Sequence, residues 1–590
     1  MKSILARLLT MVIAFHCTGL LAQKTSLQNY VPADAKGVIN LNLPSLATKM
    51  SWQQVQQLGF LSDAMKDAPP AMQELIKNPA SSGINFSAGF YIVTSAPQGD
   101  DSKAGTILYG ALSDAARFRK MIEAADSNGK ILSNGPVNTF ASKKNMIGWT
   151  SDVFAVSMPG KKKPRPSDEP EENKIKAPAI PSAAEFEKLL TPAQHALNSD
   201  PRFAKAMNEN GDIRFWVNRN YDAAKMSKNK ASQMLKMMNW SMAQSGNFMS
   251  GVVNFEKGKT VAHMRNYMNP KMDSLYRIYP NKNLNVSVFN KFPAGTPIAV
   301  FSFSLSPDFI KAIFKENGMD KMLDSVAAKS KVNLKDIAGA VNGDLTFAVI
   351  KASNLDENDS ISRNLGGLQF FLAASVKNKS KLESLIASMK KPKTEGNEDG
   401  DAPKKPGPFG SMKPAFLVND SFFVASISSF AAEKFLSSTN GNEVSSLLTP
   451  YAAHSSVFAL DLKSILGFAM QMSKKKSPGN SEEQAKMAEA FDKLVFYGGQ
   501  YEDGAALATA ELQFSDKDEN SLSQFVKFIE SAAAMGMKNK KSNSYNKDED
   551  TSPGNGDVKQ EDNEMPPPPP PPAKPKPKAK PKTVPQKKKQ

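Results

Sequence analysis

The chain has 590 residues, of which 40% are hydrophobic, and its 75 Lys and Arg residues outnumber its 58 Asp and Glu residues. The single cysteine excludes a disulfide scaffold and a multi-cysteine metal centre, and four histidines leave little room for histidine chemistry. Beyond the N-terminal segment no apolar run reaches 18 residues, which excludes a protein with several membrane-spanning helices.

The N-terminal segment is typical of a secretory signal. Lys2 and Arg7 precede an apolar stretch over residues 8–21, and Ala22 offers a small residue at the cleavage point. That stretch is shorter than the roughly 20 residues that a membrane-spanning helix needs. We therefore expect residues 1–22 to be removed, together with the only cysteine, during export. The destination is the periplasm or the cell surface, with outer-membrane association as a further option.

Strand-like and helix-like patterns alternate after the signal. Residues 38–43 alternate polar and apolar side chains like a half-buried strand, and residues 86–94 and 106–112 predict a strand pair. A helix is expected over residues 113–125, with Ser113 as its N-cap.

The second half of the chain repeats the pattern of the first half. A hairpin with a turn at residues 257–258 precedes a helix from Pro270, and a hairpin with a turn at residues 503–504 precedes a helix from Ser521. The regularity of these matches indicates an internal duplication.

We expect alternating units A, B, A′ and B′, separated by segments too polar and proline-rich to pack. The expected division is a signal peptide at 1–22, unit A at 23–158, a disordered linker at 159–181, unit B at 182–290, unit A′ at 291–430 with a disordered insertion at 390–414, unit B′ at 431–536 and a disordered tail at 537–590. Each unit reads as strand, helix, hairpin and helix. This favours an α+β fold of largely antiparallel sheets with helices packed on one face. Whether the repeats share one sheet or form two lobes stays open, and a groove between them is a candidate ligand site.

The sequence Tyr-Val-Pro-Ala-Asp-Ala at residues 30–35 stands directly before the first strand. Together with the signal and the duplicated α+β body, it resembles a family of exported Bacteroidota proteins that is known only as a domain of unknown function. The likeness would extend over residues 28–535. Many members of such families are lipoproteins, whereas the cysteine of this signal follows a histidine and forms no lipidation site. The resemblance implies export and the fold class, and it brings no catalytic residue to this chain.

Motifs of serine hydrolases, zinc proteases, phosphate-binding loops and calcium-binding loops are missing from the sequence. His195, His263 and His454 remain after export, and each is interpreted as structural because none has metal-type partners nearby. The adjacent carboxylates Glu502 and Asp503 fall at an expected turn. We therefore expect no catalytic residue, no cofactor and no metal site. Whether the chain is an enzyme stays uncertain, and the pattern favours a protein without catalysis.

Methionines recur at helical spacing in one segment. Met234, Met238 and Met242 share one face of an expected helix. An apolar core or an adaptable contact surface accounts for them better than a copper site does.

The C-terminal tail holds much of the positive charge. Seven prolines at residues 566–572 favour an extended polyproline II spacer. The residues proposed for contact with an anionic envelope surface are Lys574, Lys576, Lys578, Lys580, Lys582, Lys587, Lys588 and Lys589. Nucleic acid is not expected as a partner, because the chain is exported and the tail has no aromatic residue for base stacking.

Three functions fit these features. The first is an exported, non-catalytic binding or scaffolding protein of the cell envelope, with a flexible basic tail and an unknown partner. The second is an envelope hydrolase that acts on glycan or peptide through carboxylates in a cleft. The third is a carrier of a hydrophobic ligand. An exposed apolar groove without clustered titratable groups would favour the first function.

Overall fold

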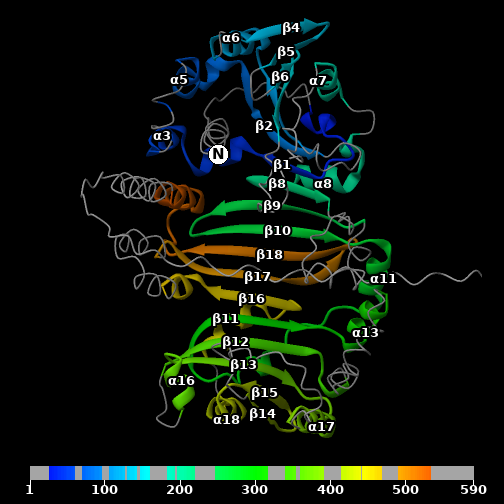
Figure 1. Ribbon diagram of the computed structural model, residues 1–590, viewed down its shortest axis with the longest axis vertical. Coiled ribbons are helices and arrows are strands. Elements are labelled where there is room, and N and C mark those ends of the chain that lie inside the picture. The colour runs from blue at the N-terminus through cyan, green and yellow to red at the C-terminus, as the bar shows by residue number, and fades with distance from the viewer. Residues whose placement is uncertain are drawn as a thin grey trace, which may run out of the picture. The chain divides into compact units, whose positions relative to one another are not determined.

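Strand pairing determines the architecture of the protein. The computed structural model describes residues 26–59, 61, 65, 70–95, 105–125, 129–141, 146–159, 183–192, 196–218, 246–316, 339–353, 359–390, 414–439, 442–467 and 489–532. Within these residues, eighteen strands form one antiparallel sheet (Figure 1). The fold is α+β, as the alternation of strand and helix patterns predicts.

The strands of the first half are β1 (Gly37–Leu41), β2 (Ile84–Ser95), β3 (Gly105–Leu112), β4 (Lys130–Asn134), β5 (Val137–Ala141), β6 (Met146–Trp149), β7 (Val153–Pro159), β8 (Ile213–Asn218), β9 (Phe248–Glu256) and β10 (Lys259–Tyr267). The strands of the second half are β11 (Gly295–Ser304), β12 (Asp344–Ala352), β13 (Leu368–Ser375), β14 (Ala415–Val418), β15 (Phe422–Ser426), β16 (Ser456–Asp461), β17 (Phe491–Glu502) and β18 (Ala505–Phe514).

The α-helices are α2 (Leu43–Lys49), α3 (Trp52–Gln56), α5 (Pro70–Lys77), α6 (Ala115–Ala125), α7 (Ala183–Leu189), α8 (Pro201–Asn208), α11 (Pro270–Ile278), α12 (Val286–Phe289), α13 (Pro307–Glu316), α16 (Ser360–Asn364), α17 (Lys379–Lys390), α18 (Ser429–Ser437) and α19 (Glu443–Leu448). A further helix covers residues 521–532 after β18. The described residues also form the short 3₁₀ helices η1 (Leu27–Tyr30), η2 (Pro79–Ser82), η6 (Leu197–Ser199) and η8 (Thr449–Tyr451). Of the helices that the structure describes, none combines the length and the apolar character needed to cross a bilayer.

The order of the strands repeats between the two halves. Hydrogen-bonded neighbours follow the order β4, β5, β6, β7, β3, β2, β1, β8, β9, β10, β18, β17, β16, β11, β12, β13, β15, β14 (Figure 1). From β1 the pairing runs through β2 and β3 to β7 on one side and through β8 and β9 to β10 on the other. From β11 it runs in the same way to β15 and to β18. The halves meet where β10 pairs with β18, with Lys259 opposite Gln513 and Tyr267 opposite Ala505. The repeats therefore share one sheet.

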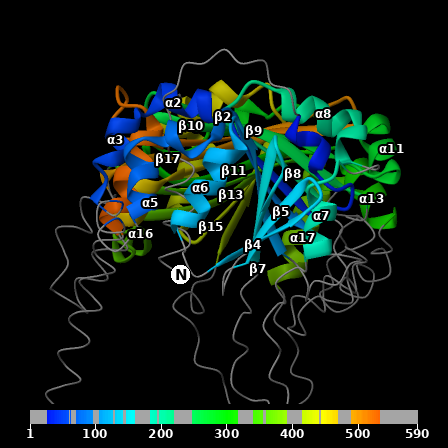
Figure 2. The ribbon, with the colours of Figure 1, turned by 90° about the horizontal axis from the view of Figure 1, so that it is seen from above.

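Side chains alternate between the two faces of the sheet, and each face has its own core. In the first half, Val38 shares one core with Phe203 of α8, and on the opposite face Leu41 and Phe90 share another with Phe118 of α6. Seen from above, α5 and α6 lie on one side of these strands and α7 and α8 on the other (Figure 2). Helices thus cover both faces, where the sequence led us to expect one. The reason is that these strands are apolar at consecutive positions and not only at alternate ones.

The two hairpins turn where the sequence predicts. The strands on either side of residues 257–258 and 503–504 pair directly with each other. Asp503 and Gly504 have φ values of 50° and 76°, the left-handed conformation that a two-residue hairpin loop requires. The strand pair predicted at residues 86–94 and 106–112 is β2 and β3.

The N-cap predicted for α6 is wrong by one residue. Asp114 Oδ1 accepts hydrogen bonds from the backbone N–H groups of Ala116 and Arg117, both at 3.0 Å. Ser113 instead donates its hydroxyl to the carbonyl of Gly83 at 3.1 Å. A carboxylate at this position also interacts favourably with the helix dipole, which a hydroxyl does not do.

We predict that the second-half core depends strongly on one aromatic side chain. Phe292 is fully buried, and its ring meets those of Phe371 and Phe435 edge-on with centroids 5.6 and 5.1 Å apart. Phe292→Ala should lower the free energy of unfolding by about 3–5 kcal/mol, measured by urea denaturation. Leu132, which is 58% exposed on β4, gives the control Leu132→Ala, expected to shift it by less than about 0.5 kcal/mol. Equal shifts in the two variants would contradict the prediction.

Candidate functional site

A row of phenylalanines crosses four neighbouring strands on one face of the sheet. Phe347 of β12 pairs with Phe301 of β11, Phe301 pairs with Phe458 of β16, and Phe458 pairs with Phe496 of β17. Directly paired residues point to the same face, so the four rings stand side by side at the strand spacing of about 4.8 Å. We call these four residues the phenylalanine row.

Apolar residues flank the phenylalanine row on the same face. They pair with one another or with the row across β13, β12, β11, β16 and β17, and they are Leu372, Val349, Ala299, Leu460 and Leu494. We call these residues and the phenylalanine row together the open apolar face. None of them carries a titratable group or a hydrogen-bonding side chain.

The two faces of these strands differ sharply in exposure. Phe301, Phe347 and Phe496 are 40%, 39% and 40% exposed. Val300 and Val495, which precede two of them along the chain and point to the opposite face, are fully buried. The strands are therefore sealed on one face and open on the other.

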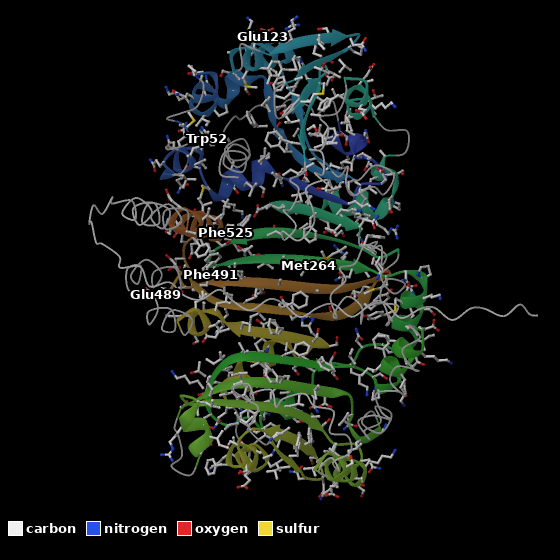
Figure 3. The ribbon with its side chains drawn as sticks, in the orientation of Figure 1. Trp52, Glu123, Met264, Glu489, Phe491 and Phe525 are labelled. Atoms are coloured by element: carbon white, nitrogen blue, oxygen red, sulfur yellow. The ribbon has the colours of Figure 1, made fainter. Side chains whose placement is uncertain are left out.

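The row of paired residues continues across the sheet to the first half, where it is covered. Phe496 connects through the central strands to Leu41 of β1, which pairs with Phe90 of β2. Leu41 is only 7% exposed and Phe90 is fully buried, in a core that contains Trp52 of α3 (Figure 3) and residues of α5 and α6. The ring of Phe118 on α6 stacks on Phe154 of the same row, with centroids 5.0 Å apart. Helices thus cover this face in the first half. In the second half, among the described residues, α17 packs on it over β14 and β15, whereas Phe301, Phe347 and Phe496 stay about 40% exposed.

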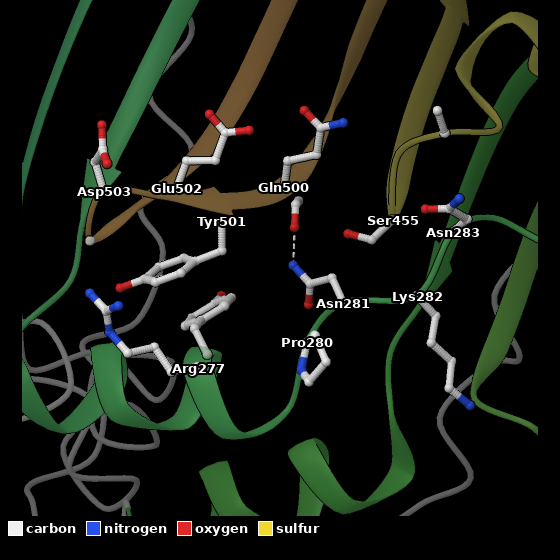
Figure 4. Close-up of a pocket in the computed structure, with 14 residues that line it drawn as sticks. Arg277, Pro280, Asn281, Lys282, Asn283, Ser455, Gln500, Tyr501, Glu502 and Asp503 are labelled. Atoms are coloured by element: carbon white, nitrogen blue, oxygen red, sulfur yellow. Dashed lines mark hydrogen bonds between the residues drawn. The ribbon is translucent and has the colours of Figure 1, made fainter.

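A polar cavity of about 490 Å³ lies at one end of the β17–β18 hairpin, next to the segment that links the two halves (Figure 4). A bulge in β17 shapes it: Gly499 has a φ of 103°, and a side chain there would collide with the hydroxyl of Ser455. The carbonyl of Gly499 accepts a hydrogen bond from Asn281 Nδ2. The side-chain oxygen of Asn281 is buried and has no hydrogen-bond partner among the described residues.

Two stacked tyrosines form one wall of this cavity. The rings of Tyr276 on α11 and Tyr501 on β17 are 4.8 Å apart and nearly parallel. Tyr501 donates its hydroxyl to Asp273, and Arg277 donates to the same carboxylate at 3.0 Å. The hydrogen bond from Arg277 and then that from Tyr501 hold the pKa of Asp273 below its usual value. Burial, and then the carboxylate, raise the pKa of Tyr501.

A second cavity of about 220 Å³ lies beside the first and shares Gln500 with it. His263 of β10 lines it, with Nδ1 3.2 Å from the hydroxyl of Thr509 on β18. His454 also lines it, and its Nδ1 is buried without a partner among the described residues. Burial lowers the pKa of His454, so this imidazole is held neutral. The ring centroid of His454 lies 4.7 Å from that of Tyr497.

Several residues singled out from sequence lie outside the described residues. These are His195, the three methionines Met234, Met238 and Met242, and the tail lysines Lys574, Lys576, Lys578, Lys580, Lys582, Lys587, Lys588 and Lys589. His263 and His454, in contrast, are brought to one cavity although they are far apart in the chain. Neither the phenylalanine row nor Asn281 was predicted from the sequence. The runs of consecutive apolar residues in β11 and β12 are the feature of the sequence that could have indicated the row.

Asp273, beside the larger cavity, and Asp503, in its lining, lack the features of a general acid. Asp273 is held as an anion by Arg277 and Tyr501, so it cannot serve as a proton donor near neutral pH. Asp503 sits in the hairpin turn with its side chain 84% exposed. A general acid needs a raised pKa, which burial usually provides. Among the described residues, no group of three or more His, Cys, Asp or Glu side chains is placed to hold a metal ion.

We predict a loss of stability at alkaline pH that depends on Tyr497. Burial, and then the charge of Glu511, raise the pKa of Tyr497 to about 12, and its hydroxyl bonds to Glu511 at 3.2 Å. A tyrosine in an unfolded chain ionises near pH 10. The stabilising contribution of the neutral hydroxyl is thus fully present below pH 10 and is lost as the pH rises to about 12.

Tyr497→Phe should therefore make the fall in unfolding free energy across this pH window shallower, measured by urea denaturation at a series of pH values. Other buried tyrosines keep part of the fall in both proteins. An identical slope for the variant and the parent protein would contradict the prediction.

Comparison with known proteins gives a family and a weak structural likeness. The chain is similar to two solved structures entitled "Structure of crystal form I of TP0453" and "Structure of crystal form IV of TP0453". The first is 10% identical over 45% of this chain and 90% of that one, with a TM-score of 0.23. The second is 11% identical over 43% and 85%, with a TM-score of 0.24. No curated protein matches the chain.

The model of a protein family described as "Domain of unknown function (DUF4836)" matches residues 27–401. The match begins just before the first strand and extends through the strands that carry Phe301 and Phe347. Because it covers more than half of the sequence, the chain belongs to the DUF4836 family.

Proposed function

We propose that the protein is an exported, non-catalytic binding protein of the cell envelope, which holds an amphipathic helix of a partner protein on its open apolar face. The observation that carries this proposal is the exposure of Phe301, Phe347 and Phe496, each close to 40%, on strands that are sealed on the other side. Scattered apolar residues are ordinary on protein surfaces, but a contiguous apolar patch points to an interaction site.

The chemistry of the face favours binding over catalysis. Hydrocarbon side chains offer no group that donates or accepts a proton, and the strand backbones beneath them are engaged in pairing. A partner therefore has to bring apolar area and needs no polar group to match. The open shape of the face is unsuited to a small carrier ligand, because ligand pockets normally enclose most of the ligand surface.

The first half of the chain supports a helix as the occupant. There the same row of paired residues lies beneath helices, and Phe118 and Ile122, one turn apart on α6, belong to the shared core. The phenylalanine row spans about 14 Å at the usual strand spacing, and a helix with its side chains is about 10 Å wide. The open apolar face thus suits one helix that presents a comparable apolar stripe.

Placement in the envelope rests on the two ends of the sequence. The signal at residues 1–22 supports export to the periplasm or the cell surface, with an origin in the Bacteroidota implied by the family resemblance. The lysines of residues 573–590, with no acidic residue among them, support contact with an anionic envelope surface.

The open apolar face can be tested with the mature chain and two probes: the apolar dye 1-anilinonaphthalene-8-sulfonate and a designed 18-residue amphipathic helix with one leucine face. Both should bind the parent protein. The double variant Phe301→Ser/Phe347→Ser should bind the peptide at least about tenfold more weakly, because central aromatic contacts dominate such interfaces.

The control is Leu132→Ser, which removes a 58% exposed side chain from β4, outside the open apolar face. It should bind both probes like the parent protein, and circular dichroism should show that all variants are folded. Absence of binding to the parent protein would mean that other parts of the chain cover the face in solution, and the proposal would be wrong. Equal affinity in parent and double variant would also contradict it.

The proposed tail contact has its own test. Deletion of residues 566–590 should reduce binding of the mature chain to vesicles that contain anionic lipid at low salt. The reason is that the deletion removes the lysines that attract the negatively charged head groups. Vesicles of neutral lipid serve as the control. Unchanged binding to anionic vesicles after the deletion would contradict a role for the tail and leave the helix proposal untouched.

A further inference from the structure

The two cavities beside β17 share two segments of the chain, residues 453–455 and residues 497–504. His454 and Gly498 line the smaller cavity. Their chain neighbours Ser455 and Gly499 line the larger one. The bulge at Gly499 and Gln500 produces this arrangement, because it displaces β17 from regular pairing with β18. Bulges often aim side chains and backbone groups at a site, and here they leave the larger cavity of about 490 Å³.

We propose that the larger cavity binds a neutral, hydroxyl-rich ligand of the size of a mono- or disaccharide. Its volume falls within the range of small-molecule sites, roughly 300–1,000 Å³. This site is separate from the open apolar face, and it goes beyond the proposed function.

The polar groups of the lining suit hydroxyls. Asn281, Asn283 and Gln500 provide side-chain amides, each of which can donate and accept hydrogen bonds (Figure 4). The hydroxyl of Ser455 donates to the carbonyl of Gly498 at 3.3 Å, so its oxygen can act as an acceptor. The buried oxygen of Asn281 has no partner among the described residues. A buried acceptor without a partner costs stability, and a hydroxyl of a bound ligand would satisfy it.

The charges of the lining favour a neutral ligand. Arg277 is engaged by Asp273 at 3.0 Å, so its charge is already compensated. Asp503 forms an ion pair with Lys205 at 3.6 Å, which leaves Lys282 and Glu502, one charge of each sign, in the lining of the cavity. An anionic or cationic ligand would meet one repulsive charge for each attractive one.

The two stacked tyrosines of the cavity wall also suit a saccharide. Tyr276 and Tyr501 are fixed by their mutual stacking and by the hydrogen bond from Tyr501 to Asp273. Aromatic rings offer an apolar surface beside polar groups. A saccharide presents the same combination, with C–H groups on its ring faces and hydroxyls at its edge.

Isothermal titration of the mature protein with glucose, N-acetylglucosamine and maltose tests this site, with glucose 6-phosphate and glucosamine as charged probes. At least one neutral sugar should bind, and more tightly than either charged probe. Gln500→Ala and Asn283→Ala, which remove exposed lining amides, should each weaken that binding at least about fivefold.

Gln53→Ala, which removes an exposed amide from α3, is the matched control and should bind like the parent protein. Phe301→Ser/Phe347→Ser should also keep sugar binding, which separates this site from the open apolar face. If no neutral sugar binds, if a charged probe binds as tightly, or if both lining variants bind like the parent protein, the proposed site is wrong.

Discussion

The antiparallel pairing of β10 with β18 is the interaction on which the rest of the structure depends. Each strand ends one half of the duplicated chain, and without the other it would be an edge strand with unpaired backbone groups. Their pairing extends from Lys259 and Gln513 to Tyr267 and Ala505. It pairs the backbone groups of both edge strands and joins the two repeated sets of strands into one sheet.

This central pairing also connects the side-chain rows of the two halves and sets the location of the two cavities. Because opposite residues share a face, the pairing connects Ala262 of β10 with Ala510 of β18 and makes one row of side chains continuous from Leu41 to Phe347. It places His263 against Thr509 at the centre of the joined sheet. The cavities next to β17 are thus consequences of joining the repeats and could not exist in one half alone.

Local features of the fold could be predicted from sequence. The hairpins at residues 257–258 and 503–504 contain residue types that favour tight turns, so their positions could be predicted. Strand and helix patterns also recur at matching places in both halves. The partner of a strand is another matter, because periodicity describes one strand at a time. Nothing in the sequence of β10 or β18 identifies the other strand as its partner. The sequence therefore left open whether the repeats form one sheet or two lobes.

The candidate sites were less accessible to sequence reasoning for a physical reason. A site recognised from sequence carries titratable groups at a fixed spacing, whereas the phenylalanine row consists of single residues on four strands from distant parts of the chain. The sequence around Phe301 and Phe347 is apolar on both faces, which indicates two buried faces. It does not indicate that one face is left open, since that depends on which elements pack above it.

The difference between the two halves is the strongest argument for binding. Duplication gives both halves the same sheet order, and the same row of paired residues passes through Phe90 in one and Phe347 in the other. Phe90 is fully buried and Phe347 is 39% exposed. An exposed phenylalanine adds little to the stability of an isolated chain, because the hydrophobic contribution scales with the area removed from water. Three of them on neighbouring strands of one row contribute more when a further apolar surface covers them, and the proposed partner helix would provide such a surface.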